Sequence, residues 1–438
     1  MSQDVDARAV RSLTRRYVVV YALATFGDWI QGAYLYAAYR GHGLAKREIG
    51  GVYVLGYAVS ATIGTAVAAM GDGHGHKRLV EAYGWLYAAS CGLLRSNAVV
   101  ALLTSRVLGG VAYSLLFSSF ESWVITEADE MRIDRKKLVG LFSVATFFNA
   151  ASAVAAGLVG NLVVQLSESD KFTWIGMEIG KNRLTNLDGE HKEQSALTLS
   201  TNAYTPAFDV GAVSLILCAV CARILWPNRT VGRPNSDSLG PPGLPASTQS
   251  AASLMAAVKM IIRTTELFSL GITNSLYEAS LHLFVFVWTP VLEKRATDGD
   301  LIPHGLLFSA FMICKMVGSQ AFNVFGSKIT AETMLRFVLS GSALCFTVAT
   351  LSTNYWLTVL AFCAFEFGLG VYWPTMSILR AQHVPNKLRA TMTSAFRIPL
   401  NFLVVALLLC AGYASDRVLL GLCAGTMFTS AYSFQLDG

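Results

Sequence analysis

The sequence predicts an all-α membrane protein with twelve transmembrane helices. Of its 438 residues, 53% are hydrophobic and only 14% are charged, whereas a soluble domain carries roughly 25% charged residues. Apolar stretches long enough to cross a bilayer, for which a helix needs about 20 residues, recur along the whole chain. The net charge of +6 gathers at the ends of these stretches, where it reports membrane topology, and no nucleic-acid-binding module is indicated.

Each expected span is an apolar run bounded by polar or charged residues. In chain order the spans are 17–39, 48–70, 79–95, 99–124, 139–165, 206–226, 266–292, 304–325, 332–352, 355–379, 388–413 and 416–434. The first run is too long for a signal peptide and lacks a small-residue cleavage site, so we expect it to remain as a helix. Lysine and arginine gather in the connections that would be cytoplasmic, which predicts that both termini lie inside.

Two long connections divide the chain. Residues 166–205 form an acidic, polar loop that we expect outside the membrane, and residues 227–257 form a linker rich in proline, glycine and serine. The predicted domains are therefore an N-terminal six-helix bundle over 1–226 and a C-terminal six-helix bundle over 258–438. Two such halves predict a pseudo-two-fold axis along the membrane normal.

Ionisable residues occur inside several expected spans. At the bilayer centre such a group costs at least ~2.5 kcal/mol, so it usually faces a partner or a polar cavity. The residues of this kind are Asp28, Arg106, Glu121, Glu278, Lys315, Glu366, Arg380 and Arg397. For each one alone, an ion pair that joins two helices is as good an interpretation as a substrate contact. Together they predict a shared polar cavity.

The fourth and tenth spans carry matching patterns. Arg106–Val111 has the spacing of Glu366–Val371, at equivalent positions in the two halves. Arg106 and Glu121 lie on one helical stripe of the fourth span, and Glu366 and Arg380 lie on one stripe of the tenth with the order of charges reversed. We expect Glu121 and Arg380 to form a cytoplasmic gate that closes when the two side chains approach each other.

The loop after the second span contains Asp72, Gly75, Lys77 and Arg78. With these residues the loop is similar to the loop signature of the major facilitator superfamily. Glycine permits a tight turn, and the cations anchor the inner surface. His74 and His76 in the same loop lack an accompanying thiol or acid cluster, and all eight cysteines fall inside expected spans. We therefore expect no metal site, no cofactor and no enzymatic activity.

Five stretches are informative together: Gly27–Gly32, Leu116–Trp123, Phe284–Leu292, Gly370–Ser377 and Phe396–Leu400. They resemble the eukaryotic molybdate-anion transporter family of the major facilitator superfamily. The resemblance implies the major facilitator fold and uptake of molybdate by alternating access. It supplies no list of binding residues, so the site residues below come from the charge pattern.

Molybdate is a tetrahedral dianion and requires hydrogen-bond donors and positive potential. Arg106 and Arg397 are the first candidates, because the guanidinium fork donates two parallel hydrogen bonds to an oxyanion. The further candidates for substrate binding are Lys315, Gln31, Tyr113 and Asn149.

Entry of a dianion against an inside-negative potential is opposed by ~2.3 kcal/mol per charge per 100 mV. Cotransport of protons removes this opposition, and Asp28, Glu278 and Glu366 are the carboxylates that we expect to carry protons or to form ion pairs in the cavity. A carboxylate is a poor contact for an anion. Asp28 is therefore expected to carry a proton or hold an arginine in place, not to bind molybdate.

Other interpretations keep the same fold. The chain could transport another small solute, such as an organic anion or a sugar, or it could be a nutrient receptor that binds without transport. In each case we expect a multi-pass protein, acting as a monomer in the lipid bilayer of the cell membrane or of an internal membrane.

Overall fold

A computed structural model describes residues 2–64, 67, 75–133, 138–168, 191–227, 255, 258–296, 302–326, 328–384 and 389–434. These residues form long helices and no strand. The helices are α1 (Ser2–Gly41), α2 (Lys46–Val59) with the π-helical turn η1 (Ser60–Gly64), α5 (His76–Leu93), α6 (Val99–Glu130), α7 (Leu138–Glu168), α8 (His191–Leu225), α10 (Thr265–Glu293), α11 (His304–Phe325), α12 (Ala331–Leu351), α13 (Tyr355–His383), α14 (Arg389–Ala411) and α15 (Asp416–Ser433).

Each expected span corresponds to one of these helices, so the prediction of an all-α multi-span protein is confirmed. By length and hydropathy alone, seven of the described helices are long and apolar enough to cross a membrane. The helices often exceed the apolar runs: α1 begins at Ser2 and α6 continues to Glu130. Hydropathy marks only the apolar part of a helix, whereas the helical backbone hydrogen bonds continue into the polar turns at its ends.

The chain divides into two compact units. Unit 1 comprises Met1–Pro234 with Pro303–Ser309, and unit 2 comprises Asn235–Ile302 with Ala310–Gly438. The first division falls within the segment predicted to be a linker. Most of that segment and most of the predicted outer loop 166–205 lie outside the described residues. The predicted domain bounds therefore stay predictions.

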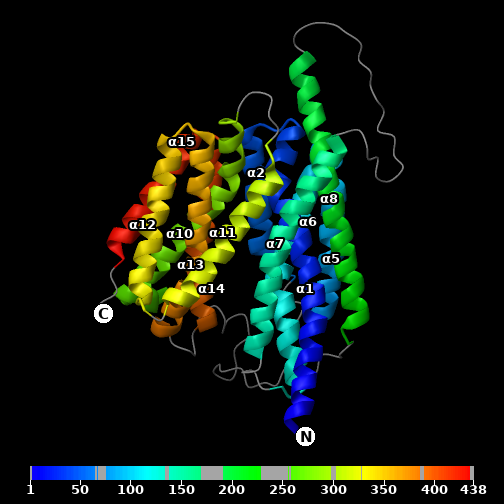
Figure 1. Cartoon of the computed structure of the whole chain (residues 1–438), viewed down its shortest axis with the longest axis vertical. Helices are drawn as coiled ribbons and strands as arrows, with labels where there is room; N and C mark the ends of the chain where they lie inside the picture. Colours follow the sequence, from blue (N-terminus) through cyan, green and yellow to red (C-terminus); the bar gives the residue numbers. More distant parts are fainter. Residues whose placement is uncertain are drawn as a thin grey trace. The chain divides into compact units, whose positions relative to one another are not determined.

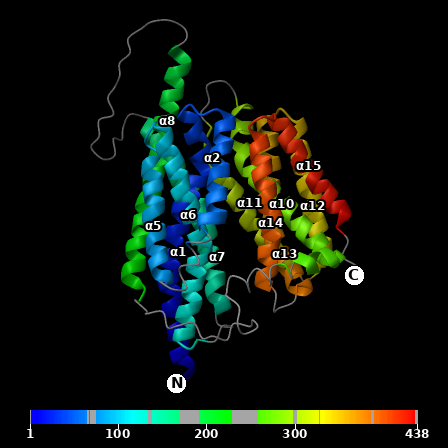
Figure 2. The same ribbon diagram turned by 180° about the vertical axis from the view of Figure 1, so that it is seen from behind.

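In unit 1, α1 packs against α7 and α8, and α5 packs against α6 and α8. These neighbours run side by side in Figures 1 and 2. An aromatic cluster closes one end of this packing: the rings of Trp123 and Trp226 stack with centroids 3.6 Å apart. Tyr17 stacks on both, and the Trp226 indole N–H donates to the Arg16 carbonyl at 3.1 Å. This cluster ties α1, α6 and the end of α8 together.

In unit 2, α12 packs against α13 and α15, and α10 packs against α13, α14 and α15. Phenylalanine rings fill the centre of this unit. The ring of Phe284 on α10 lies 5.1 Å from that of Phe362 and 5.0 Å from that of Phe365, both on α13. Edge-to-face packing of this kind adds to the area that the rings bury.

Both units contain a close helix crossing at a glycine. A Cβ atom on Gly110 of α6 would lie 2.6 Å from the carbonyl oxygen of Gly56 on α2, and a Cβ atom on Gly370 of α13 would overlap the carbonyl oxygen of Lys315 on α11. Small residues let backbones approach closely where two membrane helices cross. The sequence match between the fourth and tenth spans thus corresponds to the same packing feature in each unit.

Candidate functional site: a charged centre within the helices of each unit

The charged centre of unit 1 is Arg106 on α6. A Cβ atom at Gly56 would overlap the Arg106 guanidinium, so glycine opens the space that this group fills. The guanidinium carbon lies 5.2 Å from the centroid of the Tyr53 ring, within the range of a cation–π contact. Arg106 Nε is buried and has no hydrogen-bond partner among the described residues. Packing and an aromatic ring hold this cation, and its Nε–H stays available to another acceptor.

Asp28 on α1 belongs to the same cluster. Its carboxylate accepts a hydrogen bond from the Tyr87 hydroxyl at 2.8 Å, and Arg106 is close enough for its charge to act on the carboxylate. The structure thus brings together the acid and the cation that the sequence analysis selected in the N-terminal half. Whether Asp28 carries a proton stays a prediction.

The neutral donors predicted in this half already take part in contacts. The Gln31 amide N–H₂ donates to the Gly27 carbonyl one turn earlier, at 3.0 Å. The Asn149 amide oxygen accepts from the Trp29 indole N–H at 2.7 Å. Tyr113 is exposed on α6. The roles of Gln31, Asn149 and Tyr113 in binding stay predictions.

Tyrosines that sequence reasoning missed surround the cation. The hydroxyls of Tyr39 on α1 and of Tyr53 and Tyr57 on α2 all lie within electrostatic range of Arg106. Tyr53 and Tyr57 are four residues apart, so they share one face of α2. That spacing is visible in the sequence, but only the packing of α2 on α6 shows that this face meets the arginine. The result is a cation that contacts one tyrosine ring and has further tyrosine hydroxyls within electrostatic range.

Unit 2 has a different arrangement at the corresponding crossing. Glu366 on α13 is 4% exposed, and its Oε2 atom has no hydrogen-bond partner among the described residues. Lys315 on α11 is close enough for its charge to act on this carboxylate. A carboxylate with a nearby lysine therefore occupies the place that Arg106 and Gly56 occupy in unit 1.

Two further charged residues of unit 2, Glu278 and Arg380, act on one member of an aromatic pair. The rings of Tyr277 and Tyr372 stack with centroids 3.8 Å apart, and the charges of Glu278 and Arg380 both act on the Tyr372 hydroxyl. Tyr372 donates to the Asn274 amide oxygen at 3.3 Å. Glu278 and Arg380 thus each lie within electrostatic range of the same tyrosine hydroxyl, which sequence spacing did not predict.

Three predictions are not tested by these contacts. Glu121 is exposed on α6 of unit 1 and Arg380 lies on α13 of unit 2, so their approach as a gate stays a prediction. The backbone of Arg397 lies in α14, but its side chain is outside the described residues, as is Asp72.

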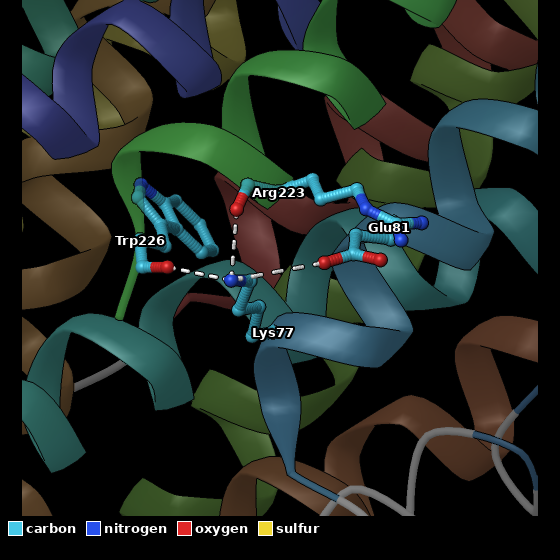
Figure 3. Close-up of polar contacts among 4 residues, drawn as sticks. All are labelled: Lys77, Glu81, Arg223 and Trp226. Atoms are coloured by element: carbon cyan, nitrogen blue, oxygen red, sulfur yellow. Dashed lines mark hydrogen bonds and ion pairs between the residues drawn. The ribbon is translucent and has the colours of Figure 1, made fainter. Parts of the chain in front are cut away.

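The described part of the inner-loop signature anchors a helix end. Gly75 precedes α5 with φ of 91°, a conformation that glycine adopts without strain. Lys77 Nζ donates to the carbonyl oxygens of Trp226 at 2.6 Å and Arg223 at 3.0 Å, and lies 4.0 Å from a Glu81 carboxylate oxygen. Figure 3 shows these contacts converging on the ammonium group. Lys77 thus caps the carboxyl end of α8, where a cation is favourable.

We expect Lys77→Ala to lower the melting temperature of the purified protein, because two carbonyls would lose a charged donor worth about 1.5–3 kcal/mol each at most. Arg78→Ala is the matched control, since Arg78 is the neighbouring cation and is exposed. Equal melting temperatures for the two variants would contradict this role of Lys77. The measurement is thermal unfolding in detergent.

A family model described as sugar transporters with 12 transmembrane segments matches residues 2–172 and 206–370. The chain belongs to this major facilitator family. This facilitator is therefore a membrane transporter by family and an integral multi-pass protein, and its described residues contain no cluster of three or more metal-ligating side chains.

Relatives of this facilitator share a more specific name. The molybdate-anion transporter of Xenopus tropicalis is 28% identical over 97% of this chain and 86% of the relative. That of Takifugu rubripes is 25% identical over 90% of this chain and 78% of the relative. These matches agree with the resemblance drawn from the sequence.

Solved structures share the fold. The nucleoside transporter NupG superposes with a TM-score of 0.71 at 12% identity, over 96% of this chain and 98% of NupG. An auto-inhibited peptide transporter of the POT family gives a TM-score of 0.67 at 11% identity, over 96% of both chains. At these identities the likeness establishes the major facilitator fold alone.

Proposed function

We propose that this facilitator transports molybdate, or a closely related oxyanion, by alternating access coupled to protons. The names of its relatives support the substrate. The observation that carries the proposal is Arg106: a cation within the helices of unit 1 whose Nε–H has no acceptor among the described residues. A donor group left in this state is expected to serve a ligand, because a buried polar group without a partner costs about 1–3 kcal/mol.

Arg106 suits an oxyanion for a physical reason. The Tyr53 ring supports the guanidinium from its face, and the Nε–H in the plane of the group has no acceptor among the described residues. No described carboxylate accepts from Nε, and the Asp28 carboxylate within electrostatic range of Arg106 accepts from Tyr87. A tetrahedral dianion supplies both the charge and the acceptors.

Carboxylates near Arg106 and Lys315 support the proposed coupling of transport to protons. Asp28 lies within electrostatic range of Arg106, and Glu366 lies within electrostatic range of Lys315. A proton bound by such a carboxylate cancels a charge that would otherwise oppose entry of the anion, at ~2.3 kcal/mol per charge per 100 mV. Asp28 and Glu366, with Glu278, are the proposed proton carriers, and Glu121 with Arg380 is the proposed cytoplasmic gate.

A second candidate is transport of a sugar, because the family model carries that description. Uptake into proteoliposomes separates the two candidates. We expect labelled molybdate to accumulate, unlabelled sulfate to compete in part, and glucose to leave uptake unchanged. An acidic exterior should increase uptake and a protonophore should abolish that increase. Competition by glucose, without accumulation of molybdate, would favour the sugar and refute our proposal.

A further inference from the structure

We infer that the hydroxyl of Tyr39 is a direct hydrogen-bond donor to the oxyanion that Arg106 holds. This inference rests on the proposed function and adds a residue that charge patterning does not reveal. It identifies the ligand class of the unit 1 centre as an acceptor-rich anion bound by one guanidinium and one phenol.

The first observation concerns the hydroxyl itself. Tyr39 is fully buried, and its hydroxyl has no hydrogen-bond partner among the described residues. Two neighbouring buried tyrosines in unit 1 are satisfied: the hydroxyl of Tyr83 donates to the Ala24 carbonyl at 3.0 Å and that of Tyr87 donates to Asp28. The Tyr34 hydroxyl also has no partner among the described residues, but its ring packs on Tyr204 and His304 instead of Tyr53. Tyr39 therefore retains a donor at a place where an unmade bond is unfavourable.

The second observation concerns its neighbours. The Tyr39 ring packs edge-on against Tyr53, with centroids 6.5 Å apart and planes at 71°. The same Tyr53 ring supports the Arg106 guanidinium. One aromatic side chain thus contacts both Arg106 and Tyr39, each of which has a donor without a partner among the described residues, and Arg106 is close enough for its charge to act on the Tyr39 hydroxyl.

The chemistry of these donors indicates what binds. A phenol O–H and a guanidinium N–H both require an acceptor, and the guanidinium also favours negative charge. The carboxylate of the cluster, Asp28, already accepts from Tyr87. A tetrahedral oxyanion presents oxygens in several directions, so it can accept from both donors at once.

The test is Tyr39→Phe in the full-length protein, with Tyr83→Phe as the matched control. Initial rates of molybdate uptake into proteoliposomes give KM, and melting in detergent with and without molybdate gives stability and ligand stabilisation. For Tyr39→Phe we expect KM to rise about tenfold, a smaller shift of the melting temperature by molybdate, and no loss of stability without ligand. For Tyr83→Phe we expect lower stability and an unchanged KM.

Two outcomes overturn the inference. One is a Tyr39→Phe protein whose KM and molybdate-induced melting shift equal those of the unsubstituted protein. The other is a Tyr39→Phe protein that loses as much stability without ligand as Tyr83→Phe, because the hydroxyl would then have a partner within the protein. If the unsubstituted protein binds molybdate but accumulates none, the proposed transport fails while the melting shift still tests Tyr39.

Discussion

Replacing Arg106 with alanine is expected to reduce molybdate uptake at subsaturating concentration by at least about thirtyfold. Removing one partner of a hydrogen-bonded charge pair in a desolvated site costs about 2–5 kcal/mol, and 2 kcal/mol corresponds to roughly this factor. The measurement is initial uptake by protein reconstituted in equal amounts. Retention of normal uptake would remove Arg106 from the substrate site.

The control for this loss is Arg95→Ala. Arg95, in the turn after α5, donates to Asp209 through Nε at 2.8 Å. The residue is therefore charged but already paired with a carboxylate. We expect its removal to leave the KM for molybdate unchanged. A similar fall in both variants would show that only the net positive charge matters.

Gly56→Ala tests the same cation without removing it. The new methyl group would overlap the guanidinium of Arg106, which must then move. Uptake should fall although the charge is retained. Gly51→Ala is the matched control on the same helix, because a Cβ atom there meets nothing within 4 Å. Gly51→Ala should transport normally.

The second large effect is expected at Gly370. A methyl group at this position would overlap the carbonyl oxygen of Lys315 and approach the Ser319 backbone nitrogen at 2.8 Å. Backbone atoms cannot move aside as a side-chain end can, so α11 and α13 must separate. Overpacking typically costs about 1–3 kcal/mol, and we expect the upper end of this range for Gly370→Ala, with a large loss of folded protein in size-exclusion profiles.

Gly341→Ala controls for the effect of replacing a helical glycine with alanine where no other helix is close. Gly341 lies in α12 of the same unit, and a Cβ atom there meets nothing within 4 Å. Alanine is favoured over glycine within a helix by about 0.5–1 kcal/mol, so this variant should be as stable as the unsubstituted protein or more stable. If Gly370→Ala melts at the same temperature as Gly341→Ala, then α11 and α13 do not pack as closely at Gly370 as in this structure.

Much of the fold could be predicted because it depends on local properties of the sequence. Apolar runs mark helices, and the expected span 304–325 coincides with α11. The ends of the helices were harder to predict than their positions. Polar turns extend α6 to Glu130 and α1 to Ser2, beyond the apolar runs, because backbone hydrogen bonding does not end where hydropathy falls.

The candidate site could be predicted only in part. Arg106 and Asp28 stand out because a charge within an apolar span is unfavourable unless something compensates for it. The packing of the Arg106 guanidinium against Gly56 and the unpartnered hydroxyl of Tyr39 depend on contacts between helices, which the sequence does not show. Gln31 shows the opposite case: it is polar and buried, yet its amide bonds to its own helix at Gly27.

Residues of opposite charge lie next to the two close helix crossings, at Gly110 in unit 1 and at Gly370 in unit 2. Gly110 has Arg106 one turn earlier on its helix, and Gly370 has Glu366 at the same spacing. A homodimer of two identical six-helix chains would repeat one side chain at both places, because each residue of a symmetric pair occurs twice. Joining both halves in one polypeptide removes that restriction. A cation can then stand in one half and a carboxylate in the other, on the same packing framework.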